Sequence, residues 1–232
     1  AAGEVVQRPA SIVKELLENA IDAGATKIEL IVEEAGRNLI KVADNGSGMS
    51  ETDARMAFER HATSKIRTTE DIFHIATKGF RGEALASIAA VAQVELKTKK
   101  QDAEIGTVIY IEGGELQFQE PAQTTEGAVF SVKNLFFNVP ARRKFLKSNN
   151  IDFRHIIDEF QRVALAHENL EFSLYHNDEV IFNLRKGSQM QRIVDIFGRK
   201  LHPLLVPIKE DLGWVKLNGF VGKPEAAKKS RG

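Results

Sequence analysis

Apolar residues recur at helical spacing near the start of the chain, and this pattern predicts a first helix. Pro9 and Ser11 open it, and the Ser11 hydroxyl is the expected N-cap to within a residue or two. Gly24 is the expected cap at the other end. The apolar positions are Ile12, Val13, Leu16, Leu17, Ala20 and Ile21. They share one side of the helical wheel, so this side is expected to pack on a core.

Alternation of apolar and polar residues predicts a series of strands. The first two, residues 28–32 and 39–43, flank the turn Gly36-Arg37-Asn38, which favours an antiparallel hairpin. The later strands are expected at residues 94–98, 107–112, 128–132, 171–175, 179–183, 204–207 and 214–221. The later helices are expected at residues 50–60, 83–91, 153–167 and 190–197. We therefore predict an α+β layer sandwich, with helices on one face of a mostly antiparallel sheet.

The pair Gly187-Ser188 is the best candidate for a linker between domains. We expect a first domain over residues 1–187 and the beginning of a second over residues 188–232. The chain begins at Ala1 instead of a methionine and stops where no element is visibly finished. It is therefore expected to be a piece of a longer protein.

Composition narrows the class of protein only slightly. Lysine plus arginine and aspartate plus glutamate number 32 each, so the net charge is zero and a wholly basic nucleic-acid binder is disfavoured. The absence of cysteine excludes disulfides and thiolate metal sites and fits a reducing compartment. No apolar run is long enough for a bilayer. The default expectation is cytoplasm for a bacterial protein, or the nucleus for a eukaryotic one, with no membrane partner.

The polar side of the first helix carries the first candidate chemistry. Glu15, Glu18, Asn19 and Asp22 share this side. Taken alone, it is more simply a solvated face. A carboxylate can also accept a proton from an attacking water, and an amide oxygen can serve a hard cation such as Mg²⁺. The i, i+4 spacing of Glu15 and Asn19 would let both side chains point into one site.

Two glycine-rich segments are candidate ligand contacts. Residues 44–48 read Asp-Asn-Gly-Ser-Gly directly after a strand, which is either a simple β-turn or the floor of a ligand site. There Asp44 could accept from the amine of adenine, while Gly46 and Gly48 let the backbone approach a ring. The segment Gly79-Phe80-Arg81-Gly82-Glu83 runs into a helix, whose N-terminus suits phosphate. It is neither a Walker loop nor a Rossmann fingerprint.

Two further polar segments admit a functional and a simpler interpretation. The stretch from Arg60 to Ile66 is a polar loop, or a lid in which Thr63, Ser64 and Lys65 face phosphates. A basic run contains Arg142, Arg143, Lys144 and Lys147. It is a solvated turn, or it contacts the phosphate backbone of DNA without sequence preference. Phe145 and Leu146 are expected to anchor this run in the core.

The order of these motifs resembles the GHKL ATPase superfamily, which includes gyrase-type topoisomerases, Hsp90-type chaperones, sensor histidine kinases and MutL proteins. Within it the resemblance to the MutL mismatch-repair family is close. It is dense from Ala1 to about Leu146 and thinner to the end. The matching segments are residues 1–6, 8–11, 22–25, 61–66, 79–85 and 140–146, of which 79–85 is the most specific.

The resemblance implies a Bergerat ATP-binding sandwich followed by the start of a ribosomal S5 domain 2-like domain. It implies that Glu15 is the general base, that Asn19 binds Mg²⁺, and that Asp44 holds the adenine amine with Gly48 near the base. Residues 63–65 and 79–83 would belong to loops that fold over ATP.

The resemblance also implies a slow ATPase that works as a switch. ATP binding would order loops and join two N-terminal halves, signalling to a MutS-type protein and to downstream repair enzymes. Gly127-Ala128 stands where the family often has Gly-Thr, so this chain would lack one hydroxyl group that faces the nucleotide. A phosphate-contacting lysine of the second domain would lie beyond Gly232, so weak hydrolysis is expected. The alternatives are another GHKL member, such as a topoisomerase ATPase, and a non-catalytic DNA-binding module.

Overall fold

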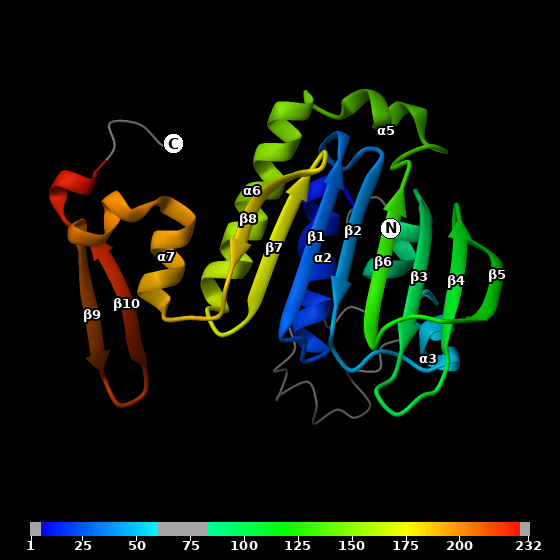
Figure 1. Cartoon of the computed structure of the whole chain (residues 1–232). Coiled ribbons are helices and arrows are strands. Elements are labelled where there is room, and N and C mark those ends of the chain that lie inside the picture. The colour runs from blue at the N-terminus through cyan, green and yellow to red at the C-terminus, as the bar shows by residue number, and fades with distance from the viewer. Residues whose placement is uncertain (1–5, 60–82, 228–232) are drawn as a thin grey trace.

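The computed structural model describes residues 6–59 and 83–227. Its main feature is an eight-stranded sheet with the strand order β5-β4-β3-β6-β2-β1-β7-β8 (Figure 1). The strands are β1 (Lys27–Glu33), β2 (Leu39–Asp44), β3 (Gln93–Lys99), β4 (Gly106–Glu112), β5 (Glu115–Ala122), β6 (Gly127–Lys133), β7 (Glu171–His176) and β8 (Glu179–Leu184). Within the described chain β1 and β7 pair in parallel and the other neighbours are antiparallel, so the predicted mostly antiparallel sheet is confirmed.

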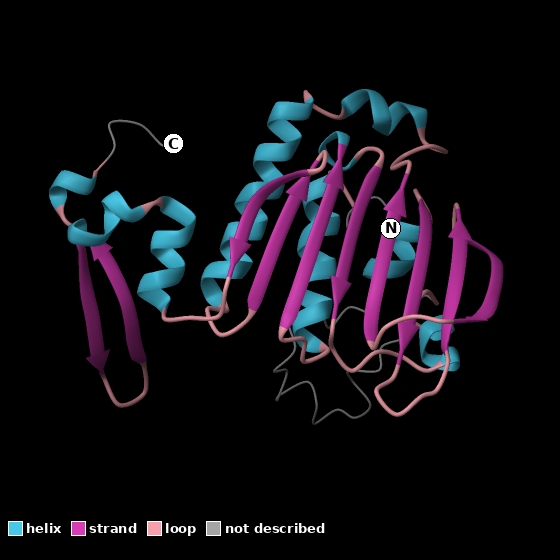
Figure 2. Ribbon diagram, viewed as in Figure 1, coloured by secondary structure: helices cyan, strands magenta, loops and turns pink. Residues whose placement is uncertain are grey.

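Helices cover one face of this sheet, as the sequence predicted (Figure 2). They are α2 (Pro9–Asp22), α3 (Glu51–Met56), α4 (Ala84–Ala89), α5 (Pro140–Phe145), α6 (Asn149–Ala166) and α7 (Gln189–Phe197). The helix α2 contacts both β2 and the long helix α6. Alternate residues of each central strand point toward the helices and are buried, as in β1, where Ile28, Leu30 and Val32 are fully buried. This two-layer core fixes the ends of α2 relative to the ends of the strands.

The first helix begins earlier than its sequence suggested. Arg8 is the N-cap and makes no side-chain capping bond, so the expected cap at Ser11 is wrong. Ser11 lies in the first turn and its N–H donates to the carbonyl of Arg8 at 3.0 Å. Pro9 explains the start, because its ring presets the helical φ and its missing N–H costs nothing at the first helical position.

The last segment forms a separate two-stranded sheet from β9 (Leu205–Asp211) and β10 (Lys216–Gly222). It lies beyond α7, and the short 3-10 helices η3 (Arg199–Leu204) and η4 (Pro224–Ala226) flank it (Figure 1). By contrast, α7 contacts α6 and β8, and its residue Ile196 belongs to the main core. The division at residue 188 stays a prediction, and we propose from this packing that the first unit extends to Gly198.

Candidate functional site

The polar side of α2 has the exposure that a site requires. Glu15, Glu18, Asn19 and Asp22 are partly exposed, while the apolar side is buried. Lys14 lies 3.9 Å from the carboxylate of Glu18, as an i, i+4 pair. Exposed pairs of this kind contribute little to stability. The helix therefore offers acidic groups and an amide along one accessible face.

A Schellman motif ends α2 beside the Asp-Asn-Gly-Ser-Gly turn. Gly24 has a φ of +73°, its N–H donates to Ile21 at 2.9 Å, and the N–H of Ala25 donates to Ala20 at 3.1 Å. The carbonyl of Ala23 then accepts from the N–H of Ser47 at 2.9 Å. The end of α2, one turn after Asn19, is in this way bonded to the turn that follows Asp44.

The turn itself is held by its own side chains. Asp44 is the last residue of β2, and its carboxylate accepts from the N–H of Gly46 at 2.8 Å. Asn45 accepts from the N–H groups of Thr26 and Lys27 at 2.9 and 2.8 Å. These bonds are Asx-turn chemistry, in which the side chains of Asp44 and Asn45 hold the local backbone.

Close backbone contacts add a requirement that an ordinary turn lacks. Gly48 has a φ of +63°, and a Cβ there would lie 2.0 Å from the carbonyl oxygen of Lys99. A Cβ on Gly127, at a φ of +98°, would lie 2.1 Å from the carbonyl oxygen of Asp44. Both positions therefore demand glycine on steric grounds. The ends of β2, β3 and β6 meet here with no room for side chains between them.

A row of residues crosses the sheet at this end on the helix-covered face. In register, Asp44 lies opposite Ala128, Ala128 opposite Thr98, and Thr98 opposite Thr107. The next row inward is apolar, with Val42, Phe130, Leu96 and Ile109 in register. The row of residues 44, 128, 98 and 107 therefore marks the edge where the core gives way to polar contacts.

Asp44 is the charged member of this row. Burial raises the pKa of its carboxyl group above the ordinary value, and the backbone N–H groups of Gly46 and Ala128 partly oppose this rise. A partly desolvated carboxylate with fixed neighbours gains from an N–H donor of a ligand. Ala128 is 6% exposed and presents only a methyl group, so no hydroxyl stands at this place in β6.

Glu15 lines a cavity of about 270 Å³ between α2 and α6. Arg8, Ala10, Ser11, Lys14, His155 and Glu159 complete its lining. The cavity gives a water molecule access to the Glu15 carboxylate. Sequence reasoning had no signal for the residues of α6, because their approach to α2 depends on the packing of two distant helices.

Several candidate residues lie outside the described residues. They are Thr63, Ser64, Lys65, Gly79, Phe80, Arg81 and Gly82. Glu83 is described, as the N-cap residue of α4, and its side chain makes no capping bond. Within the described ranges no three His, Cys, Asp or Glu side chains are grouped to hold a metal ion.

Most of the basic run is helical, where the sequence suggested a turn. Arg142, Arg143 and Lys144 lie in α5, which crosses above one end of the sheet (Figure 1), and Lys147 follows the helix. Arg143, Lys144 and Lys147 are exposed, while the guanidinium of Arg142 lies 6.0 Å from the centroid of the Phe136 ring. Phe145 is 83% exposed, so the expectation that it anchors the run in the core is wrong. The reason is that α5 buries none of its own residues, and only Leu146, directly after the helix, packs against the core.

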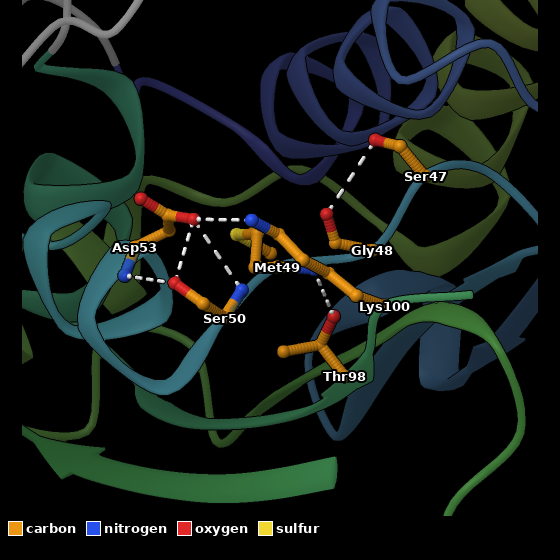
Figure 3. A network of polar contacts seen from close by, with 7 residues as sticks. All are labelled: Ser47, Gly48, Met49, Ser50, Asp53, Thr98 and Lys100. Carbon is orange, nitrogen blue, oxygen red and sulfur yellow. Dashed lines mark hydrogen bonds and ion pairs between the residues drawn. The ribbon is translucent and has the colours of Figure 1, made fainter. Parts of the chain in front are cut away.

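Thr98 and the group Ser50, Asp53 and Lys100 are contacts that the sequence interpretation missed. Ser50 caps α3 in a capping box with Asp53, and Lys100 lies 3.1 Å from Asp53 (Figure 3). Thr98 bonds the turn to β6. A signal for Thr98 was present, because it continues the inward alternation of Val94 and Leu96 with a polar residue.

Comparisons with known proteins agree with this geometry. Residues 7–126 match the family model described as histidine kinase-, DNA gyrase B- and HSP90-like ATPase. Over the whole chain the sequence is 63% identical to the DNA mismatch repair protein MutL of Flavobacterium psychrophilum and 60% identical to that of Christiangramia forsetii. The chain spans 38% of the length of each of these relatives.

Solved structures are similar as well. The Aquifex aeolicus MutL ATPase domain complexed with ADP is 28% identical, with a TM-score of 0.70 over 89% of this chain and 73% of that one. A second structure of that ATPase domain, from the mismatch repair endonuclease, is 25% identical, with a TM-score of 0.71 over 97% of this chain and 76% of that one. In the described part of the chain no helix is long and apolar enough to cross a membrane.

Proposed function

The chain belongs to the histidine kinase-, DNA gyrase B- and HSP90-like ATPase family and within it resembles the MutL mismatch-repair proteins throughout, and we propose that it binds and slowly hydrolyses ATP as the switch of such a protein. The observation that carries this proposal is the meeting of α2 with the glycine-rich turn after Asp44. The glycines required at positions 48 and 127 let the backbone of this turn pack directly on the ends of β3 and β2, which fixes the turn beside Asp44.

Adenine recognition is assigned to the turn. The carboxylate of Asp44 accepts a hydrogen bond from the 6-amino group of adenine, a position at which guanine carries a carbonyl oxygen that cannot donate. The backbone at Gly46 and Gly48 contacts the face and edge of the ring. Since Ala128 lacks a hydroxyl, the backbone of β6 supplies the remaining polar contacts in this row.

Hydrolysis is assigned to α2. The carboxylate of Glu15 holds and deprotonates the attacking water, which reaches it in the cavity beside α6. The side-chain oxygen of Asn19, one turn further, fits a place in the coordination of Mg²⁺. A bound magnesium ion would neutralise charge on the phosphates. Residues 63–65 and 79–83 close over the phosphates.

The switch acts through assembly. ATP binding orders these loops and brings two copies of the domain together, and hydrolysis resets them. In the full-length protein this cycle signals to a mismatch-recognition protein of the MutS type and to downstream repair enzymes.

Replacing Asn19 with alanine is expected to remove the magnesium dependence of nucleotide binding. The reason is that alanine offers no oxygen to the cation, and removing one ligand typically weakens a site by about tenfold or more. Calorimetric titration of the full-length protein with a non-hydrolysable ATP analogue, with and without Mg²⁺, measures this. Asn150→Ala on α6 is the matched control, because Asn150 is exposed and lies on another helix. Absence of binding by the wild-type protein in both conditions would contradict the ATP site itself.

A second candidate function is favoured by the exposure of the basic side chains of α5. We propose that Arg142, Arg143, Lys144 and Lys147 contact DNA phosphates without reading sequence. The double replacement Arg143→Glu/Lys144→Glu is expected to weaken DNA binding and to lower the slope of log affinity against log salt by about 2, one for each basic side chain that no longer neutralises a phosphate. A fluorescence titration at several salt concentrations measures the slope. Lys200→Glu/Lys209→Glu, at exposed sites elsewhere, controls for net charge; an equal weakening there would exclude a specific role for α5.

A further inference from the structure

We propose that Thr98 is a positioning residue for adenine recognition, whose buried hydroxyl holds the Asp44–Gly48 turn and the Gly127–Ala128 peptide in one arrangement. This inference rests on the proposed ATP site and adds to it a residue that does not contact the nucleotide. Thr98 acts through Asp44, two strands away across the sheet.

The Thr98 hydroxyl uses both of its hydrogen-bonding functions. Its oxygen accepts from the backbone N–H of Met49 at 2.9 Å (Figure 3). Its hydrogen is donated to the carbonyl of Gly127 at 2.7 Å. The residue is 0% exposed. Removing the hydroxyl would take a donor from the carbonyl of Gly127 and an acceptor from the part-buried N–H of Met49, which is more costly than the loss of one exposed bond.

One peptide unit connects Thr98 to Asp44. The carbonyl of Gly127 and the N–H of Ala128 belong to the same planar group, so fixing the direction of one fixes the other. Ala128 lies directly opposite Asp44 in the register of β6 and β2, and its backbone N–H lowers the pKa of the Asp44 carboxyl group, against the rise that burial causes. The hydroxyl of Thr98 therefore fixes the peptide that lies beside Asp44.

The same hydroxyl fixes the far end of the turn. Met49 follows Gly48, whose backbone packs directly on the carbonyl of Lys99. The side chain of Thr98 thus connects both ends of the turn, at Asp44 and at Met49, to the strands β6 and β3. Hydrogen bonds connected in series strengthen one another, so both ends are expected to shift together when this side chain is altered.

The contacts that connect this region to α3 are weaker than the hydrogen bonds of the buried Thr98. The side chains of Lys100 and Asp53 in their ion pair are 50% and 54% exposed. Solvent screens such a pair, and its net contribution is small. The buried Thr98 is consequently the member of this group on which the position of the turn depends.

A neighbouring threonine separates positioning from general stability. Thr107 lies opposite Thr98 in the adjacent strand and is also buried, at 4% exposure. Its hydroxyl donates to the carbonyl of Glu120 in the edge strand β5 at 3.2 Å. Thr107→Val also removes a buried hydroxyl, but on the side of β3 that faces away from β6 and the turn. We therefore expect it to lower stability about as much as Thr98→Val and to leave adenine recognition unchanged.

The test uses the full-length protein with Thr98→Val, Thr98→Ser and Thr107→Val, in titrations with non-hydrolysable ATP and GTP analogues. Thr98→Val is expected to weaken ATP binding by about tenfold, the equivalent of one buried hydrogen bond, and to lower the preference for ATP over GTP. Thr98→Ser retains the hydroxyl and should stay within about twofold of wild type. Thr107→Val should leave affinity and preference unchanged.

Thr98→Cys, which keeps the size of serine but offers a weaker hydrogen-bonding group, replaces Thr98→Val if that variant does not fold. An ATP affinity and ATP-to-GTP preference in Thr98→Val or Thr98→Cys equal to those of Thr98→Ser would overturn the positioning role. So would an equal weakening in Thr107→Val. Either of these results, obtained with a wild-type protein that binds ATP, would contradict only the positioning role of Thr98. A wild-type protein that does not bind ATP would contradict the proposed function itself.

Discussion

Replacing Glu15 with glutamine is expected to lower kcat for ATP hydrolysis by about 10²- to 10⁴-fold, the usual contribution of a general base, while ATP binding changes little. Glutamine has nearly the same shape but cannot accept the proton of the attacking water. Glu15 is partly exposed on a helix whose opposite side makes the core, so the fold is not disturbed. Steady-state phosphate release by the full-length protein measures hydrolysis, and a titration with a non-hydrolysable analogue measures binding.

Two other glutamates provide matched controls for this prediction. Glu18 lies on the same helix and pairs with Lys14, and Glu159 lines the cavity of Glu15 while pairing with Arg162 at 2.6 Å. Glu18→Gln and Glu159→Gln should both retain most of the activity. Hydrolysis at the wild-type rate in Glu15→Gln, or a comparable loss in Glu159→Gln, would show that α6 and not α2 supplies the base.

Local pattern predicted the elements that bury one face. Strands such as β1 and β3 alternate buried and half-exposed residues along their whole length, so their period is visible in the sequence. The edge strand β5 was missed, because most of its residues are exposed and no alternation develops. Helix α5 was missed for a related reason, since it buries no residue of its own. Elements at the margin of a fold carry little periodic signal.

The candidate site residues also divide into those that the local pattern identified and those that it missed. Glu15, Asn19 and Asp44 were identified from local spacing and from the resemblance, and α2 and β2 form as predicted. The roles of these residues remain proposals. The alternation of β3 marks Thr98 as a polar residue at an inward position, but its role could not be identified, because its partners Met49 and Gly127 are distant in sequence and meet it only in the folded sheet. Strand order and register are set by long-range pairing, which a single sequence does not encode in any local pattern.

Replacing Arg192 with methionine is expected to cost about 3–5 kcal/mol of local stability at the junction of α6, β7, β8 and α7. Arg192 is 1% exposed, and its guanidinium donates to the carbonyls of Ala164 at 2.7 Å, Leu170 at 2.6 Å and Arg185 at 3.1 Å. It also reaches the carbonyls of His167 and Glu168 at 3.3 Å. Methionine has a similar length but cannot donate, so all five carbonyls would lose the bond from Arg192, and those of Ala164, His167 and Glu168 would keep only a backbone N–H donor.

The end of α6 explains why an arginine is needed at position 192. The last carbonyls of a helix have no partner within it and attract a positive charge. The planar guanidinium has five donors and can serve several carbonyls at once, whereas the ammonium group of a lysine has three. Arg192→Lys should therefore fall between wild type and Arg192→Met. Hydrogen exchange of the full-length protein measures the effect, as faster exchange of the amides of α7 and of the last turn of α6.

Arg154→Met, at an exposed position of α6, is the control and should leave exchange unchanged. Arg192 lies near the β7–β8 edge, whereas the proposed adenine contacts lie on β2, β6 and β3. Loss of protection in Arg192→Met should consequently stay local, and ATP affinity should be retained while the domain is folded. Unchanged exchange in α7 would contradict the role assigned to Arg192. Uniform loss of protection, including in β2 and β6, would instead mean that α7 unfolds together with the whole ATPase core.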